Sequence, residues 1–564
     1  MNKSPRKRTL RRVILLLVLA TVVAIVCLAV LDQPHPNAHL EKVGTVHFEA
    51  SCAPRVAPKF DRALAMLHSF EFSAAIDAFH GVLKEDPNCA IAYWGIALSQ
   101  WDNPFAGHRP PEVLKDAGAT IQKGIAIGAK TQRENDYLAA VTELYKNADT
   151  VNEHTRTLNY EAAMERLAHK YPDDFEAQIF YALALAQDAS PEDKTYARQT
   201  QAAAILESAI EKQPDHPGAT HYLIHVYDVP SLAVHGLKAA SHYASIAPSS
   251  PHALHMPSHV FTRVGDWQAS IDANLASAKA SREQCSPGEL LHALDYLEYA
   301  YLQTAQDRSA HGVLDQMQTA GRYVGGWRSH VPESLFRYVI RRASPAPAFA
   351  LAAIPARYAL EREAWSEASG LEVFTAPEAP YTDAITRFAR ALGFARSGDP
   401  ASARREIAEL EKLHAGLAAK NDVYWAKQVD IERLAASAWA SHAEGKQGEA
   451  LSLMRSAAEE EDGTEKNAIT PGPLKPAREQ LGELLLELNQ PARALKEYET
   501  TLVQEPNRFR AIYGAAHAAK LAGDTVKARM HYQHLLLICQ KADSDRPELQ
   551  EARPARLKTP RPSP

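Results

Sequence analysis

The distribution of apolar and charged positions divides the chain into two unequal parts. Residues 13–31 form a run without a single charge, and only basic residues carry charge before Asp32. At about 1.5 Å per residue, a helix of that length crosses a bilayer. Beyond residue 55, apolar residues recur at helical spacings almost to the C-terminus. The pattern predicts one transmembrane helix followed by an all-α region.

Positive charges next to a membrane helix stay in the cytoplasm. Residues 1–12 are therefore expected to be a basic cytoplasmic tail, and 13–31 a single-pass anchor in a bacterial inner membrane. The bulk of the chain would then be periplasmic. A cleaved signal peptide is the alternative, but its apolar core is usually about 7–15 residues and ends in small residues. The segment 29–32, Ala-Val-Leu-Asp, fits such a cleavage site poorly, and an uncleaved anchor is favoured.

Small and aromatic residues recur at a fixed spacing in the second part. A small residue is followed twelve positions later by another, then by an aromatic residue four positions on, and often by a proline. This spacing is found at Ala63, Ala75, Phe79 and Pro87, at Gly482, Ala494, Tyr498 and Pro506, and at Ala516, Ala528 and Tyr532. Small residues let two helices cross closely, and proline ends a helix because it lacks an N–H. The spacing predicts successive pairs of helices.

The spacing resembles the tetratricopeptide repeat (TPR) family over about residues 56–540. The segments 92–97, 250–259 and 470–474 are also similar to bacterial membrane-anchored TPR proteins, a resemblance that brings no activity with it. The TPR resemblance implies a TPR-type α-solenoid, a right-handed superhelix of helix pairs. It further implies a concave groove that binds a protein, a peptide or a small ligand.

Changes in composition suggest boundaries along the chain. Residues 32–55 contain three prolines and are expected to be a linker. The remaining expected parts are an N-terminal TPR-like array at 56–343 with a histidine-rich centre, a Pro/Ala-rich break at 344–355, a C-terminal array at 356–541 and a disordered tail at 542–564. A long loop at 459–475 is expected inside the second array, and long loops in compact regions are often functional.

The net charge bears on the kind of partner, and the cysteines bear on a possible disulfide. The net charge of −6 over 564 residues gives no argument for a nucleic-acid partner. Cys52 and Cys89 lie on either side of the first predicted helix pair. In an oxidising periplasm they are candidates for a disulfide, whereas the alternative is that Cys89 is simply a small buried residue.

Histidine is the most informative residue type because of its clustering. His221 and His255 are separated by 34 residues, and so are His225 and His259. This separation is the period of the tetratricopeptide repeat, so each residue is expected to stack on its counterpart. His252 lies on the same predicted face as His255 and His259. His292 and Asp295 lie three residues apart on the next first helix.

These residues predict a transition-metal site. Neutral imidazole suits zinc, copper or iron, and histidines four residues apart on a helix often bind a metal together. The candidate ligands are His221, His225, His252, His255, His259, His292 and Asp295. The candidates for orienting these ligands, or for contacting a bound molecule, are Asp228, Glu289, Arg263 and Tyr296.

Two other interpretations of the histidines remain open. One is a metal-free clamp for a peptide or an anion, and the other is a structural role in the core. A metal-dependent hydrolase or oxidoreductase built on the same residues is the alternative to a binding protein. His47, His68 and His108 are expected to be packing or surface residues.

Overall fold

The structure is a computed structural model that describes residues 41–106, 109–325, 345–377 and 379–556. These residues form helices joined by turns and short loops, with no strand among them. The expected membrane anchor at 13–31 lies outside the described residues. Within them, no helix is both long enough and apolar enough to cross a bilayer.

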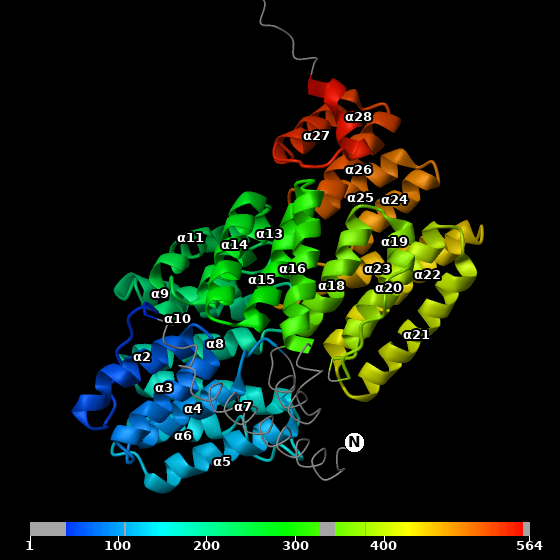
Figure 1. Cartoon of the computed structure of the whole chain (residues 1–564). Coiled ribbons are helices and arrows are strands. Elements are labelled where there is room, and N and C mark those ends of the chain that lie inside the picture. The colour runs from blue at the N-terminus through cyan, green and yellow to red at the C-terminus, as the bar shows by residue number, and fades with distance from the viewer. Residues whose placement is uncertain (1–40, 107–108, 326–344, 378, 557–564) are drawn as a thin grey trace, which may run out of the picture. The chain divides into compact units, whose positions relative to one another are not determined.

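The helices follow one another in antiparallel pairs (Figure 1). The N-terminal helices are α2 (Ala57–His68), α3 (Phe72–Glu85), α4 (Ala90–Trp101), α5 (Pro111–Ile127), α6 (Gln132–Thr142), α7 (Glu153–Lys170), α8 (Phe175–Gln187) and α9 (Ala197–Lys212). The central helices are α10 (Pro217–Val226), α11 (Leu237–Ile246), α12 (Pro251–His255), α13 (Pro257–Val264), α14 (Trp267–Glu283), α15 (Pro287–Gln303) and α16 (Asp307–Gly325). Two short 3₁₀ turns, η2 (Pro54–Val56) and η3 (Ala233–Gly236), complete this part.

The C-terminal helices continue the same arrangement. They are α18 (Ala346–Glu361), α19 (Trp365–Ser369), α20 (Tyr381–Arg396), α21 (Pro400–Ala419), α22 (Val423–Ala443), α23 (Gln447–Asp462), α24 (Ala477–Glu487), α25 (Pro491–Gln504), α26 (Phe509–Leu521), α27 (Thr525–Ile538) and α28 (Pro547–Arg556). Each of these helices packs on its neighbours in sequence, so the core runs along the chain.

Glycine followed by aspartate explains several of the turns between paired helices. Gly265 and Gly523 have φ of 71° and 82°, a left-handed conformation that glycine adopts without strain. The aspartate that follows each of them caps the next helix. The carboxylates of Asp266 and Asp524 accept hydrogen bonds from the amides three residues on, at 3.1 and 3.0 Å. One helix therefore ends and the next begins within two residues.

The aromatic positions of the repeat pack against small residues as the spacing predicts. A Cβ added to Gly482 would lie 2.9 Å from the ring of Tyr498, and one on Gly514 would lie 2.3 Å from it. Tyr498 thus contacts the first helix of its own pair and that of the following pair. Phe79 packs in the same way on Gly95. The predicted helix pairs are confirmed, and their close crossings depend on these small residues.

The Pro/Ala-rich segment differs from the expected break at 344–355. From residue 346 it forms α18, which packs on α15 and α20 and joins the neighbouring pairs. Pro347 lies in the first turn, where its missing N–H costs nothing. Pro355 lies inside the helix, and buried alanines on either side of it allow close packing. A high alanine content therefore outweighs one interior proline.

The structure describes residues 41–55 of the expected linker. Residues 42–53, which precede the 3₁₀ turn η2, pack on the repeats. Phe48 is buried against Phe60, Trp94 and Tyr137, with ring centroids 5.2, 5.7 and 5.4 Å away. The segment has no regular secondary structure. It acts as an additional layer on the first helices.

The expected disorder after residue 542 is wrong for residues 547–556, which form α28. Buried ion pairs hold this region in place. Arg546 pairs with Asp307 at 2.5 Å, and Glu548 pairs with Arg510 at 2.5 Å. The helix packs on α27, and its Leu549 and Ala552 are buried in the C-terminal core.

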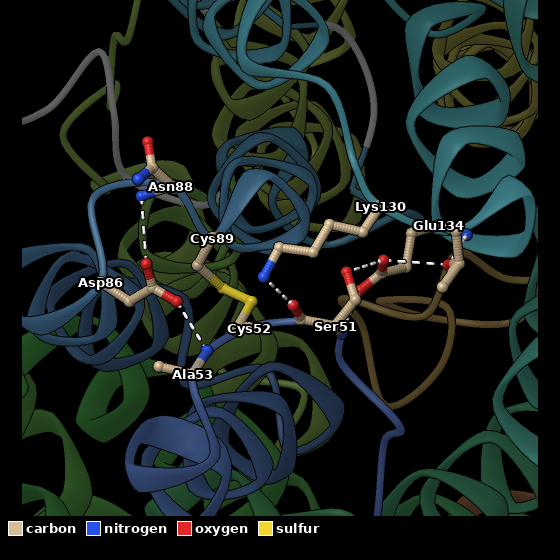
Figure 2. The surroundings of a disulfide bond; sticks show 9 residues. Ser51, Cys52, Ala53, Asp86, Asn88, Cys89, Lys130 and Glu134 are labelled. Atoms are coloured by element: carbon tan, nitrogen blue, oxygen red, sulfur yellow. Dashed lines mark hydrogen bonds between the residues drawn. A yellow bond between two sulfur atoms is a disulfide. The ribbon is translucent and has the colours of Figure 1, made fainter.

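Cys52 and Cys89 form a disulfide with Cα atoms 4.9 Å apart (Figure 2). It joins the segment before α2 to the N-terminal end of α4. Hydrogen bonds hold the same segment: Asp86 accepts from the amide of Ala53 at 2.7 Å, and Lys130 donates to the carbonyl of Ser51 at 2.8 Å. Residues 51–53 are thereby fixed at the start of the repeats.

We expect replacement of both Cys52 and Cys89 by alanine to destabilise α2–α4 by about 2–4 kcal/mol, because the unfolded chain is no longer constrained. Hydrogen exchange of these helices in increasing urea measures the loss locally, which suits repeat proteins because each repeat contacts only its neighbours. Cys285→Ala is the matched control, because Cys285 is a free, exposed thiol. Equal protection in the double variant and the control would contradict the expectation.

Candidate functional site

Six histidines of the central helices lie together. They come from α10 (His221 and His225), α12 (His252 and His255), α13 (His259) and α15 (His292). Five of them are at most 8% exposed, and His225 is half-buried. Little water reaches these side chains, so their buried ring nitrogens need hydrogen-bond partners within the protein.

Their ligand atoms converge in two groups of three. In what we call the first trio, His221, His225 and His252, these atoms all lie within 4.8 Å of one another. The second trio, His255, His259 and His292, meets the same limit. The sequence period brings His225 close to His259, with ring centroids 5.6 Å apart. His221, however, faces His252 and not His255.

The first trio is built around two facing nitrogens. The Nε2 atoms of His221 and His252 are 3.2 Å apart. The Nδ1 of His221 lies 2.7 Å from the backbone carbonyl of His68, which can only accept, so Nδ1 carries the proton. The Nδ1 of His252 lies 3.2 Å from the carboxylate of Glu289. The Nε2 of His225 is buried without a hydrogen-bond partner among the described residues.

The second trio repeats this arrangement with other acceptors. The Nε2 atoms of His255 and His259 are 3.0 Å apart. The Nδ1 of His259 donates to Asp228 at 2.9 Å. The Nδ1 of His255 lies 2.7 Å from Oδ1 of Asn274, whose amide nitrogen already donates to a carbonyl. The Nδ1 of His292 is buried without a partner in the described part of the chain.

Burial favours the neutral form of five of these rings. It lowers the pKa of His259 to about 4, although the hydrogen bond to Asp228 acts in the opposite direction. Burial also lowers the pKa values of His221, His225, His255 and His292 well below the usual value. With the proton on Nδ1, the Nε2 atoms of His255 and His259 each present a lone pair to the other. That contact is repulsive unless a cation lies between them.

Asp228 connects the second trio to positively charged groups. Its carboxylate accepts from His259, from Arg263 at 3.0 Å and from Lys466 at 2.7 Å. Burial by itself would raise the pKa of Asp228, but Lys466, His259 and Arg263 together hold it well below the usual value. Asp228 is therefore an anion that orients His259, and Arg263 acts through it. Such carboxylate–histidine bonds commonly fix metal-binding imidazoles.

The other predicted residues divide between the site and its surroundings. Glu289 orients His252, and the hydroxyl of Tyr296 lies 3.3 Å from Nδ1 of His259. Asp295 instead forms a buried ion pair with Arg357 at 2.5 Å, and Glu298 lies 3.4 Å from the same guanidinium. Asp295 is not among the residues whose ligand atoms converge in the trios.

A third cluster, which the sequence analysis missed, consists of His68, Glu176 and His216. Glu176 accepts from Nε2 of His68 at 2.8 Å and from Nε2 of His216 at 2.9 Å. The remaining nitrogens accept from Tyr222 and from the amide of Ala219. All its ring nitrogens have partners, so this hydrogen-bonded cluster is structural. His68 is thus a packing residue, as expected, but its carbonyl also positions His221.

The loop between α23 and α24 covers the site. The first residues of the expected 459–475 loop belong to α23, and the remainder is irregular. Glu465 pairs with Arg263 at 3.4 Å, and Lys466 is buried on Asp228. Tyr296 donates to the carbonyl of Thr470 at 2.9 Å. The sequence showed only that the loop was long, and the residues it brings to the site were missed.

A cavity of about 110 Å³ lies beside this loop. Its walls include Arg263, Glu465 and Lys466, together with the aromatic residues Tyr381 and Trp425, whose rings stack 3.8 Å apart. No histidine lines it. Arg263 and Lys466 separate the cavity from the second trio, and both of them contact Asp228.

No protein-family model and no curated protein matches the sequence. Solved structures match at low identity. A structure of the APC/C hetero-tetramer Cut9–Hcn1 is 11% identical over 88% of this chain and 89% of that one, with a TM-score of 0.33. The human IFIT1 dimer with m7Gppp-AAAA is 12% identical over 90% and 94%, with a TM-score of 0.36. The P58(IPK) TPR domain is 16% identical over 68% and 98%, with a TM-score of 0.20. These likenesses assign no function or partner.

We expect Arg357→Met to lower the free energy of unfolding by about 3–5 kcal/mol, because it leaves Asp295 buried without its counter-charge. Adding Asp295→Asn should restore part of the loss. Urea denaturation of both variants measures the difference. Arg404→Met is the control, since its ion pair with Glu444 is partly exposed and contributes under about 1 kcal/mol. A double variant less stable than Arg357→Met would contradict this assignment of Asp295.

Proposed function

We propose that this chain is a membrane-anchored TPR-like protein whose buried central histidines bind a divalent transition metal. One observation carries the proposal. The Nε2 atoms of His255 and His259 face each other at 3.0 Å while fixed acceptors hold both Nδ1 protons. A bound cation turns this repulsive contact into two favourable bonds. Neutral imidazoles in such a site suit zinc, copper or iron.

The two competing interpretations fit the geometry less well. A metal-free clamp needs histidines that a ligand can contact, yet His221, His255 and His259 are at most 1% exposed. A purely structural role needs partners for the ring nitrogens. The cluster of His68, Glu176 and His216 has such partners, whereas the Nε2 atom of His225 and the Nδ1 atom of His292 have none among the described residues. Binding of a protein or peptide by the repeats would use other surfaces.

The location belongs to the proposal as well. The basic tail and apolar run at 1–31 favour an inner-membrane anchor with the repeats in the periplasm. The disulfide between Cys52 and Cys89 supports an oxidising compartment. A periplasmic protein would take up its metal outside the cytoplasm.

We expect the purified full-length protein to contain zinc, copper or iron, or to retain one of them after reconstitution and dialysis. Elemental analysis per mole of protein measures the content. His225→Ala/His259→Ala should lose most of the metal, because it removes one ligand from each trio. The matched control is His80→Ala/His242→Ala, which removes two exposed histidines. If the parent protein retains none of the three metals after reconstitution, the proposal is rejected.

A metal-dependent hydrolase or oxidoreductase is the second candidate, and the number of histidines in each trio favours it. Three imidazoles leave one position of a tetrahedral ion for water or a substrate, as in catalytic zinc sites. The loop residues Glu465 and Lys466 form part of both the cavity wall and the surroundings of Asp228. A purely structural metal site would instead be closed by four protein ligands.

Whether a bound ion has an open coordination position can be tested directly. We expect azide to change the visible absorption spectrum of the cobalt-loaded full-length protein, since a small anion enters an open coordination position. Titration with azide at constant ionic strength measures this change, with chloride as the control anion. A spectrum that azide leaves unaltered would show a closed site and exclude the enzyme candidate.

A further inference from the structure

The six histidines do not converge on one point, and their division into trios has a consequence for stoichiometry. Each trio contains one facing pair of Nε2 atoms, at 3.2 Å in the first and 3.0 Å in the second. Two nitrogens bound to one tetrahedral ion at about 2.0–2.1 Å lie about 3.3 Å apart. Each facing pair therefore has nearly the spacing of two ligands on a single ion.

Each trio also has one ring nitrogen that the protein leaves without a partner. In the first trio this atom is Nε2 of His225, and in the second it is Nδ1 of His292. Buried polar atoms without a partner are rare, because each costs free energy. In both cases the other two members of the trio form the facing pair. Each trio therefore contains a third imidazole with a ring nitrogen that no described residue binds.

We propose that the centre holds two metal ions, one bound by His221, His225 and His252 and the other by His255, His259 and His292. This inference rests on the proposed metal binding and specifies its stoichiometry. The trios are fixed independently. Outside groups for the first are Glu289 and the carbonyl of His68, and those for the second are Asp228 and Asn274. Removing one ion should therefore leave the other site intact.

The two ions would be close neighbours. The rings of His225 and His259, from different trios, are 5.6 Å apart, and those of His252 and His255 are 6.3 Å apart. Separations within a trio are similar, since His225 and His252 are 6.5 Å apart. Two neighbouring metal ions are the arrangement found in two-metal hydrolytic sites. A carboxylate contacts one histidine of each trio: Glu289 in the first and Asp228 in the second. These carboxylates offset part of the positive charge that the ions would add.

The cluster of His68, Glu176 and His216 provides an internal contrast. Its ligand atoms also lie within 4.8 Å of one another. All of its ring nitrogens are nevertheless hydrogen-bonded, and Glu176 lies between the two histidines as the acceptor for both. Proximity alone therefore does not make a metal site. The trios differ because their nitrogens face each other or face no partner.

The test is the number of ions per full-length chain after reconstitution with excess zinc and dialysis. We expect about two equivalents in the parent, about one in His225→Ala and in His292→Ala, and almost none when both are replaced. Glu176→Gln is the control and should retain about two. One equivalent in the parent, lost completely in either single variant, would overturn the two-ion inference and leave metal binding standing. Absence of zinc, copper and iron in the parent would reject both.

A second measurement uses only the parent protein and therefore does not depend on whether a variant folds. Copper(II) loaded to saturation in the parent protein should give an electron paramagnetic resonance signal broadened by coupling between neighbouring spins. Loading with half as much copper should reduce the broadening. A fully loaded protein with the sharp signal of isolated ions would overturn the inference, because the trios are too close for two bound ions to remain uncoupled.

Discussion

The candidate centre depends on the hydrogen bonds that hold the outer nitrogen of each paired imidazole. A carbonyl, a carboxamide oxygen and two carboxylates each lie at Nδ1 of one buried ring. These bonds determine the tautomer, and the tautomer directs the Nε2 lone pairs toward one another. The burial of His259 and its low pKa prevent a proton from relieving that contact. What makes the histidines unusual is therefore the direction of their lone pairs, more than their number.

The repeat architecture brings these histidines together without any special element. Successive first helices lie side by side, so α10, α12, α13 and α15 each add one or two histidines to a common region. Pro257 divides what would be a single helix into α12 and α13. His252 belongs to the first trio, whereas His255 on the same short helix and His259 on α13 belong to the second. The outer partners come from elsewhere, with His68 on α2 and Asn274 on α14.

Sequence periodicity predicted the helix pairs and the histidine cluster, because these features depend on local spacing. Asp228 and Glu289 were named as candidates near the cluster, and they lie beside His259 and His252. It could not predict which histidines face each other. His221 was expected against His255, yet it faces His252 at 3.2 Å, because the repeat period relates helix positions and not the directions of individual side chains. Sequence periodicity also could not predict contacts between distant parts of the chain. The bond from His221 to His68 spans 153 residues, and that from Lys466 to Asp228 spans 238. Asp295 was misplaced because its partner, Arg357, lies 62 residues further along the chain, beyond the reach of local spacing.

Asp228 links the candidate metal centre to the loop above it. Its Oδ2 atom accepts from both Nδ1 of His259 and Nζ of Lys466. A cation on Nε2 of His259 would make the Nδ1 proton more acidic and strengthen its bond to this oxygen. The hold of the same oxygen on Lys466 would change in turn, and Lys466 lines the cavity. Coupling of this kind is reciprocal by thermodynamic necessity. A molecule that binds in the cavity and draws Lys466 away from Asp228 would therefore alter the affinity of the second trio for its ion.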